Sequence, residues 1–402
     1  MARYYLLKHT GSDNRKRNRK RSHVVGFVLL FLVAIQLSMS FLFDQEKVAG
    51  SVPPACQEMV PGELILRERT NQSALSEIKN WPKHPDEKSI CFWDSNWLLH
   101  QHLPHAMQWI YRCWTIWEKY PGEKVLLKNP DDWKVKVTRY LTKIFNPYSK
   151  GEFIDGMLSA MEEAFDVKLL LSNEISKHDR QYAIDAKSET CGGNHCMRRQ
   201  DAWKWTEGII RHENLHEERI GCKGPVRIGI LNRAHDNGRS ILNAGRIMEK
   251  LRHEYGQNVR VDESTMDGKS FREQIGWFAS HDIIFTGHGA QETSLPFMPR
   301  CGVIMEIFPF GYYVPHKFGS LADSTHVRHY SMYDNNTTDP IADTQAKIDR
   351  YADRVNVRAA NFCPAADSIV HYISTAIRDW ELCCKDVEES FNFSVGSSTS
   401  IK

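Results

Sequence analysis

The stretch DIIFTGHGAQETSLPF, residues 282–297, decides the fold class of this chain. It starts as a short apolar run, turns at Gly287-His288-Gly289-Ala290, and takes on helical character near Gln291. A buried strand that leads through a glycine turn into a helix is a unit of parallel α/β sheets. Small residues let the backbone approach a ligand, and the first N–H groups of a helix attract anions. The turn is therefore either an anion seat, with His288 able to hydrogen-bond a phosphate or reacting hydroxyl, or simply a tight packing turn.

Strands and helices continue to alternate on both sides of this stretch. Strands are predicted at 226–232, 258–263 and 302–309, and helices at 240–255 and 269–280. In such sheets, ligands bind beyond the carboxyl ends of the strands. Arg233 and Arg239 follow the first of these strands, where guanidinium groups can clamp a diphosphate bidentately. Glu306 lies within the apolar run GVIMEIFPF. A buried carboxylate is costly unless it binds a polar group, such as a ribose hydroxyl.

The amino-terminal part has the pattern of a membrane signal anchor. Residues 1–23 carry eight Lys or Arg against one acid, and the uncharged run 24–43 follows them. A helix of this length spans about 30 Å, the thickness of the hydrocarbon core of a bilayer. The basic flank is expected in the cytosol, which places residues 44–402 in the lumen of the secretory pathway. A cleaved signal peptide would leave these residues in the same environment.

Cysteines and glycosylation sequons agree with a lumenal body. All ten cysteines follow the apolar run, where disulfides can form. Four N-glycosylation sequons lie on the same side, at Asn71, Asn335, Asn336 and Asn392. We expect a Cys191–Cys196 disulfide, and we expect Cys383 and Cys384 to bond to distant partners rather than to each other. The net charge of +2 does not indicate a nucleic-acid-binding protein.

Composition divides the chain into six predicted parts. These are a cytosolic tail (1–23), a transmembrane anchor (24–43), a lumenal stem (44–80), a first globular domain (81–222), a second globular domain with a closing helix (223–385) and a disordered tail (386–402). In the first globular domain, the Trp-rich stretch 93–120 is apolar at helical spacing, which predicts a buried helix. The run KVLLKN at 124–129 predicts a short strand.

Two segments, LNRAHDNGRSILN (231–243) and SHDIIFTGHGAQETSLPFMPRCGVIMEIFP (280–309), resemble glycosyltransferase family 61 in residues and spacing. The family contains plant xylosyl- and arabinosyltransferases and animal sugar transferases of the secretory pathway. The resemblance implies an α/β, GT-B-like fold in which two Rossmann-type domains face a cleft, an acceptor-side domain at 81–222 and a nucleotide-sugar-binding domain at 223–385. The single N-terminal transmembrane helix predicted at 24–43 precedes them. The resemblance also implies inverting transfer from UDP-xylose, UDP-arabinose or UDP-N-acetylglucosamine to a glycan or glycoprotein in the Golgi or ER. No metal or other cofactor is expected, and the chain has no Asp-x-Asp triplet.

The resemblance also carries over the site positions. The predicted donor-binding residues are Arg233, Arg239, Asn243, His288, Gly289, Ala290, Thr293 and Glu306. The segment HQHLPHAMQ falls where the family has a His-containing helix, so His105 or His102 is predicted to be the general base. The chain departs from the family at two points. Gln108 stands near the family's carboxylate, and Gln291-Glu292 follows the turn, which places an acid near the donor.

Two other functions fit parts of the sequence. A non-catalytic lumenal sugar-binding protein on the same fold would account for the departures at Gln108 and Gln291-Glu292. A zinc metallopeptidase is suggested by His212-Glu213-Asn214-Leu215-His216, because two His at i and i+4 of a helix can bind zinc beside a basic Glu. A catalytic zinc needs three protein ligands, however, and no third ligand follows this motif.

Overall fold

The computed structural model describes residues 56–67, 88–93, 103–119, 122–128, 152–171, 174–180, 184–185, 197, 199–219, 221–309, 312–334 and 358–396. These residues all belong to one compact unit, Cys56–Lys402. The predicted anchor at 24–43 and the predicted Cys191–Cys196 disulfide lie outside the described residues. Within the described ranges, no helix combines the length and the apolar composition needed to cross a bilayer.

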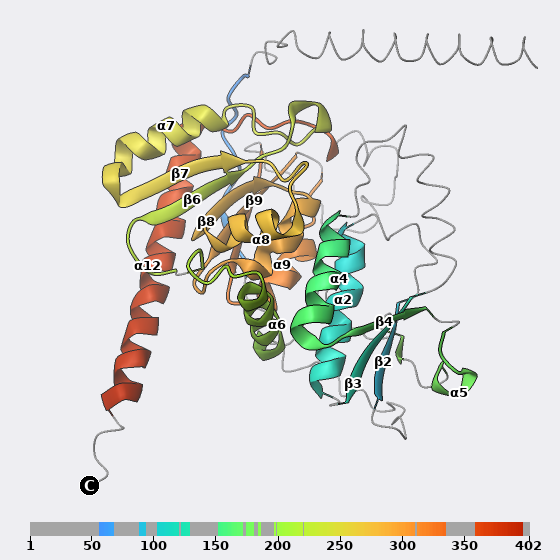
Figure 1. Cartoon of the computed structure of the whole chain (residues 1–402). Helices are drawn as coiled ribbons and strands as arrows, with labels where there is room; N and C mark the ends of the chain where they lie inside the picture. The colour runs from blue at the N-terminus through green and yellow to red at the C-terminus, as the bar shows by residue number, and fades with distance from the viewer. Residues whose placement is uncertain are drawn as a thin grey trace, which may run out of the picture. The chain divides into compact units, whose positions relative to one another are not determined.

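A six-stranded sheet forms the carboxyl-terminal half of the fold (Figure 1). Its strands are β1 (Ile65–Leu66), β6 (Val226–Leu231), β7 (Val259–Ser264), β8 (Ile283–Gly287), β9 (Val303–Phe308) and β10 (Arg328–Tyr333). Their order is β1-β10-β9-β8-β6-β7, and all neighbours are parallel except β1 and β10. The five parallel strands have the order of a doubly wound fold, in which the direction of winding reverses between β6 and β8.

Helices cover both faces of this sheet. They are α7 (Ala244–Tyr255), α8 (Phe271–Ala279), α9 (His316–Asp323), α12 (Ala366–Gly396) and the 3-10 helices η4 (His235–Asn237), η5 (Gly256–Asn258) and η6 (Ala290–Phe297). Val303 and Met305 of β9 share a core with α7 and α12, whereas Ile304 shares a core with α8, α9 and η6. Successive strand side chains point to opposite faces, so one continuous apolar strand supplies both cores. The strands and helices predicted in 226–309 are therefore confirmed.

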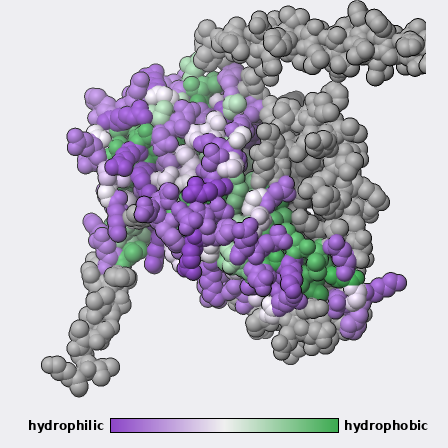
Figure 2. Space-filling model, in the orientation of Figure 1, coloured by the Kyte–Doolittle hydropathy of each residue, from purple (hydrophilic) through white to green (hydrophobic). Residues whose placement is uncertain are grey.

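A second sheet of four parallel strands is formed by residues that lie between β1 and β6 in the chain. It consists of β2 (Lys88–Trp93), β3 (Glu123–Lys128), β4 (Lys168–Leu171) and β5 (Ile184–Asp185), in the order β4-β3-β2-β5. Its helices are α2 (Leu103–Lys119), α4 (Glu152–Phe165), α5 (Lys177–Arg180) and α6 (Arg199–His212). Figure 2 shows hydrophobic residues gathered around α4 and β4 on an otherwise mostly hydrophilic face. The chain is thus a mixed α/β protein with largely parallel sheets, as predicted.

The helices of the second sheet pack against the first. The predicted Trp-rich helix is α2, and its Trp114 and Trp117 are almost completely buried. The ring of Phe153 on α4 meets that of Phe271 on α8 edge to face, with centroids 5.0 Å apart. One hydrophobic cluster runs through α2, α4, α6, α8 and η6, so the two halves share a core.

Two of the predicted chain divisions differ from the structure. Residues 56–67, expected to be stem, are part of the fold, because Ile65 and Leu66 pair with β10 and Met59 forms a bridge with Pro364. Two-residue strands carry no periodicity that a sequence can display. At the other end, α12 continues to Gly396, so the expected tail 386–402 begins inside a helix.

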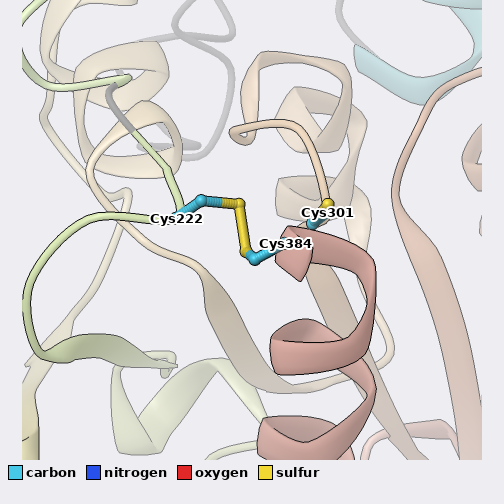
Figure 3. A group of neighbouring side chains, drawn as sticks. All are labelled: Cys222, Cys301 and Cys384. Atoms are coloured by element: carbon cyan, nitrogen blue, oxygen red, sulfur yellow. A yellow bond between two sulfur atoms is a disulfide. The ribbon is translucent and has the colours of Figure 1, made fainter. Parts of the chain in front are cut away.

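Four disulfides join described cysteines: Cys56–Cys363, Cys91–Cys113, Cys222–Cys384 and Cys301–Cys383. The adjacent Cys383 and Cys384 bond to different distant partners, as predicted. Figure 3 shows the bond from Cys384 to Cys222, with Cys301 beside it. Because Cys222 precedes β6 and Cys301 precedes β9, both bonds fasten α12 to the amino edge of the large sheet.

Candidate functional site

The predicted site lies where the winding of the large sheet reverses. Arg233 follows β6 by two residues, and His288 and Gly289 directly follow β8, which is the neighbour of β6. The connections that leave these two strands run to opposite faces of the sheet. In doubly wound folds, ligands bind at this point, beyond the carboxyl ends of the strands. The strand order, which the sequence did not reveal, therefore brings the two predicted segments together.

Two guanidinium groups converge on Gly289. A Cβ at this position would lie 2.8 Å from Nη1 of Arg233 and 3.6 Å from Nη1 of Arg239. The φ of Gly289 is −178°, extended backbone that any residue adopts. A side chain at this position would therefore displace the Arg233 guanidinium, although the backbone conformation itself does not demand glycine. Arg239 Nη1 also donates to the backbone oxygen of His288 at 2.8 Å.

Arg239 has an unfavourable backbone conformation. Its φ is 61°, in the left-handed region that residues with a Cβ rarely adopt. Its N–H donates to the Ala360 oxygen at 3.1 Å, and the next N–H, of Ser240, donates to Oδ1 of Asn361 at 3.0 Å. The segment that begins at Arg358 thus holds the loop in place. Such strain persists where the surroundings impose it, and it clusters at binding sites.

Positive charge accumulates around the turn. Burial, followed by the charges of Arg233 and Arg358, lowers the pKa of Arg239 to about 10. Lys317 of α9 adds to the positive field at His288. Positive charge gathered in this way favours an anion at the turn. No sequence pattern points to Lys317 or Arg358, because neither directly follows a predicted strand.

Beneath the turn lies a network of two histidines and two glutamates, each at most 3% exposed. His288 Nδ1 contacts Glu306 Oε1, and His329 Nε2 lies 2.7 Å from Glu306 Oε2. Glu292 Oε1 accepts the N–H of Gly289 at 2.7 Å and lies 3.9 Å from His288 Nδ1. Buried polar groups persist where they find such partners, so the network fastens the turn from below.

Burial also sets the protonation of this network. It raises the pKa of Glu292 to about 8, and burial together with Glu292 raises the pKa of Glu306 well above its usual value. Burial lowers the pKa of His288 well below its usual range and that of His329 to about 3. At neutral pH both histidines are therefore neutral, and most Glu292 carboxyls carry a proton. The acid that the sequence places beside the donor is thus turned inward and largely uncharged.

The other residues that are predicted to bind the donor have hydrogen-bond or ring contacts within the protein. The His288 ring stacks on Phe308 at 4.9 Å, so it faces the protein interior. Both oxygens of Glu306 contact histidines, and its contact with a ribose stays a prediction. Thr293 Oγ1 donates to the oxygen of Ala290, the first residue of η6, at 2.6 Å. Asn243, which precedes α7, donates to the Pro364 oxygen at 2.6 Å.

The predicted base residues belong to the start of α2. His105 lies on this helix, and His102 lies just before it, outside the described residues. Tyr111 Oη donates to the Thr293 oxygen at 2.8 Å, so α2 is anchored on the 3-10 helix that starts at the turn. Tyr111 lies about 9 Å along the helix axis from His105. The assignment of the base stays a prediction.

The five residues of the metallopeptidase motif do not lie together on one helix. Helix α6 ends at His212, and Asn214 has a left-handed φ of 55°. The N–H of Leu215 donates to Ile210 at 2.9 Å and that of Asn214 to Arg211 at 3.2 Å, which is a Schellman motif. The two histidines therefore do not share a helical face, and the spacing on which the zinc interpretation depends is lost.

Among the described residues, two side-chain groups bring metal-ligating residue types together. Cys222, Cys301 and Cys384 are bound in disulfides. His288, Glu292 and Glu306 place ligand atoms within 4.8 Å of one another. These atoms already contact each other and Gly289, and the field of Arg239 and Lys317 opposes a further cation. A metal-free site stays a prediction.

The comparisons with known proteins agree with this geometry. A family model described as Glycosyltransferase 61 matches residues 57–305, which is more than half of the 402-residue chain. No individual curated protein matches the chain. The matched stretch contains β6, β8, both predicted arginines and the turn at Gly289. The chain therefore belongs to the Glycosyltransferase 61 family, and it is a glycosyltransferase.

Proposed function

We propose that the enzyme transfers a sugar, with inversion, from a UDP-sugar to a glycan or glycoprotein. The donor diphosphate binds between Arg233, Arg239 and the backbone at Gly289. The convergence of two guanidinium groups on one glycine, at the reversal of the sheet, carries this proposal. A diphosphate supplies the negative charge that this cluster favours, and its oxygens match the fork geometry of arginine.

The chemistry follows from these positions. The acceptor hydroxyl attacks the anomeric carbon while His105 or His102 takes its proton, and the bond from that carbon to the UDP oxygen breaks. The arginines stabilise the charge that develops on the departing diphosphate, with Arg358 and Lys317 contributing to the field. These cations supply the role that a divalent metal has in other sugar transferases. UDP-xylose, UDP-arabinose and UDP-N-acetylglucosamine are the proposed donors.

We further infer a GT-B arrangement, with the acceptor bound on the side of residues 81–222. The second parallel sheet supports this proposal, as does the anchoring of α2 on η6. We place the enzyme in the Golgi or ER membrane, held by residues 24–43. The four disulfides between described cysteines support an oxidising compartment.

Arginine replacements test the diphosphate site. Arg233→Ala and Arg239→Ala each remove a charge-assisted contact, so we expect UDP to bind about 10- to 100-fold more weakly. Calorimetric titration of the purified full chain with UDP measures the affinity. Arg246→Ala is the control, because that guanidinium is 58% exposed and pairs with Glu58. Wild-type UDP affinity in Arg233→Ala would show that the site is assigned wrongly.

Gly289→Ala tests the geometry of the same site without removing a charge. The added Cβ displaces the end of the Arg233 side chain, which is flexible, so we expect weaker UDP binding and an unchanged melting temperature. Gly245→Ala is the matched control, because a Cβ there meets nothing within 4 Å. Hydrolysis of a panel of UDP-sugars by the wild-type enzyme then identifies the donor.

A further inference from the structure

His329 has a place in the buried network that the proposed transfer step does not use. It lies on β10, two strands away from β8 and its turn. Its Nε2 is 2.7 Å from one oxygen of Glu306, whose other oxygen contacts Nδ1 of His288. Glu306 of β9 is in register with Thr286 of β8 and Ser331 of β10. Three side chains thus form a continuous chain across three strands to the donor turn.

The surroundings of His329 define the direction of its hydrogen bond. Among the described residues, its Nδ1 is buried and has no hydrogen-bond partner. The ring is neutral and carries one proton, which belongs on Nε2, where Glu306 accepts it. His329 therefore offers Glu306 a fixed donor and holds that carboxyl in one orientation.

Glu306 transmits this orientation to the turn. Its Oε1 contacts the ring of His288, which is stacked on Phe308. The backbone oxygen of His288 receives Nη1 of Arg239 at 2.8 Å. A carboxyl group free to rotate would release the His288 ring, and the carbonyl that holds the arginine would move with it.

We propose that His329 is a positioning residue for glycosyl transfer: through Glu306 and His288 it holds Arg239 at the diphosphate seat. The inference rests on the proposed function, because it assumes that Arg239 binds the donor diphosphate. His329 lies beyond residue 305, where the family match ends.

Two isosteric replacements of His329 separate positioning from packing. His329→Gln places an amide nitrogen near the position of Nε2, whereas His329→Asn places one near Nδ1. We expect the Gln enzyme to bind UDP within about 2-fold of wild type and the Asn enzyme to bind it about 10-fold more weakly. Titration of the full chain with UDP measures both. Amide hydrogen exchange at Gly289 should be faster in the Asn enzyme alone.

The outcomes distinguish the two proposals. Equal UDP affinity and equal Gly289 exchange in the Gln and Asn enzymes would overturn the positioning role. If the wild-type chain does not bind UDP, the donor assignment fails, and Gly289 exchange still decides the role of His329. If His329→Asn does not fold, Glu306→Gln replaces it, with the same expected loss of UDP affinity and faster exchange. A wild-type result for Glu306→Gln would also overturn the role.

Discussion

Glu292 changes its chemistry by turning inward at the start of η6. Along the sequence it follows the turn Gly287-His288-Gly289-Ala290 by two residues, which suggests an acid that faces a diphosphate. In the fold it is completely buried and accepts the N–H of Gly289, and burial raises its pKa to about 8. The residue therefore closes the turn, and it does so mainly in the protonated form at neutral pH.

The raised pKa of Glu292 makes stability depend on pH. The folded chain retains a proton that the unfolded chain releases near pH 4.5. The contribution of this carboxyl group to the free energy of unfolding is therefore largest below pH 4.5, and it falls as the pH rises to about 8. One proton contributes at most about 1.4 kcal/mol per pH unit. Glu292→Gln cannot ionise, and denaturant unfolding between pH 5 and 8 should show a shallower fall than wild type.

The exposed Glu249 provides the comparison for this measurement. Glu249→Gln should retain the wild-type slope. An unchanged slope in Glu292→Gln would show that the carboxyl is ionised throughout the range, and the inward, protonated state would be wrong.

The site residues differ in how far the sequence predicted them. Arg233 and Arg239 could be predicted from the sequence because they follow a strand whose apolar pattern is easy to recognise. Lys317 and Arg358 were not, because they come from a helix and a connecting segment that only the tertiary fold brings to the turn. His329 lies in the mixed segment RHYSMY, where a buried polar residue looks like an exposed one.

At the scale of elements, local pattern was sufficient where strands are apolar and long. The strands β6, β8 and β9 were predicted because each is a mainly apolar run with at most one charged residue. β1 and β10 were missed, since the first has two residues and the second mixes polar and apolar side chains without a regular period and without a clear turn before it. Strand order, which created the site, is a tertiary property that no local pattern contains.

The ending of α6 leads to a prediction at this scale. Because Asn214 terminates the helix before His216, Glu213→Gln and His216→Ala should leave the hydrolysis of UDP-sugars unchanged. Neither change should alter the metal content of the protein after dialysis, measured by elemental analysis. Loss of stoichiometric zinc from either variant would restore the metallopeptidase interpretation.

Over the whole molecule, the segment 358–396 adds contacts to the candidate site, and it lies outside the residues that the family model matches. The match ends at residue 305, yet Ala360 and Asn361 bond to the Arg239 loop and α12 covers one face of the sheet. Three disulfides tie this segment to the rest of the chain, through Cys363, Cys383 and Cys384.

These three bonds make backbone continuity between Asp334 and Arg358 unnecessary for holding the enzyme together. A protease site inserted between these residues should yield, after cleavage, a two-chain enzyme that migrates as one species without reductant and still binds UDP. Reduction should release the carboxyl-terminal piece, and UDP binding should be lost with it. Separation of the pieces on a non-reducing gel would contradict the pairing. The mature enzyme would thus tolerate a cut in its polypeptide that the newly made, still reduced chain would not.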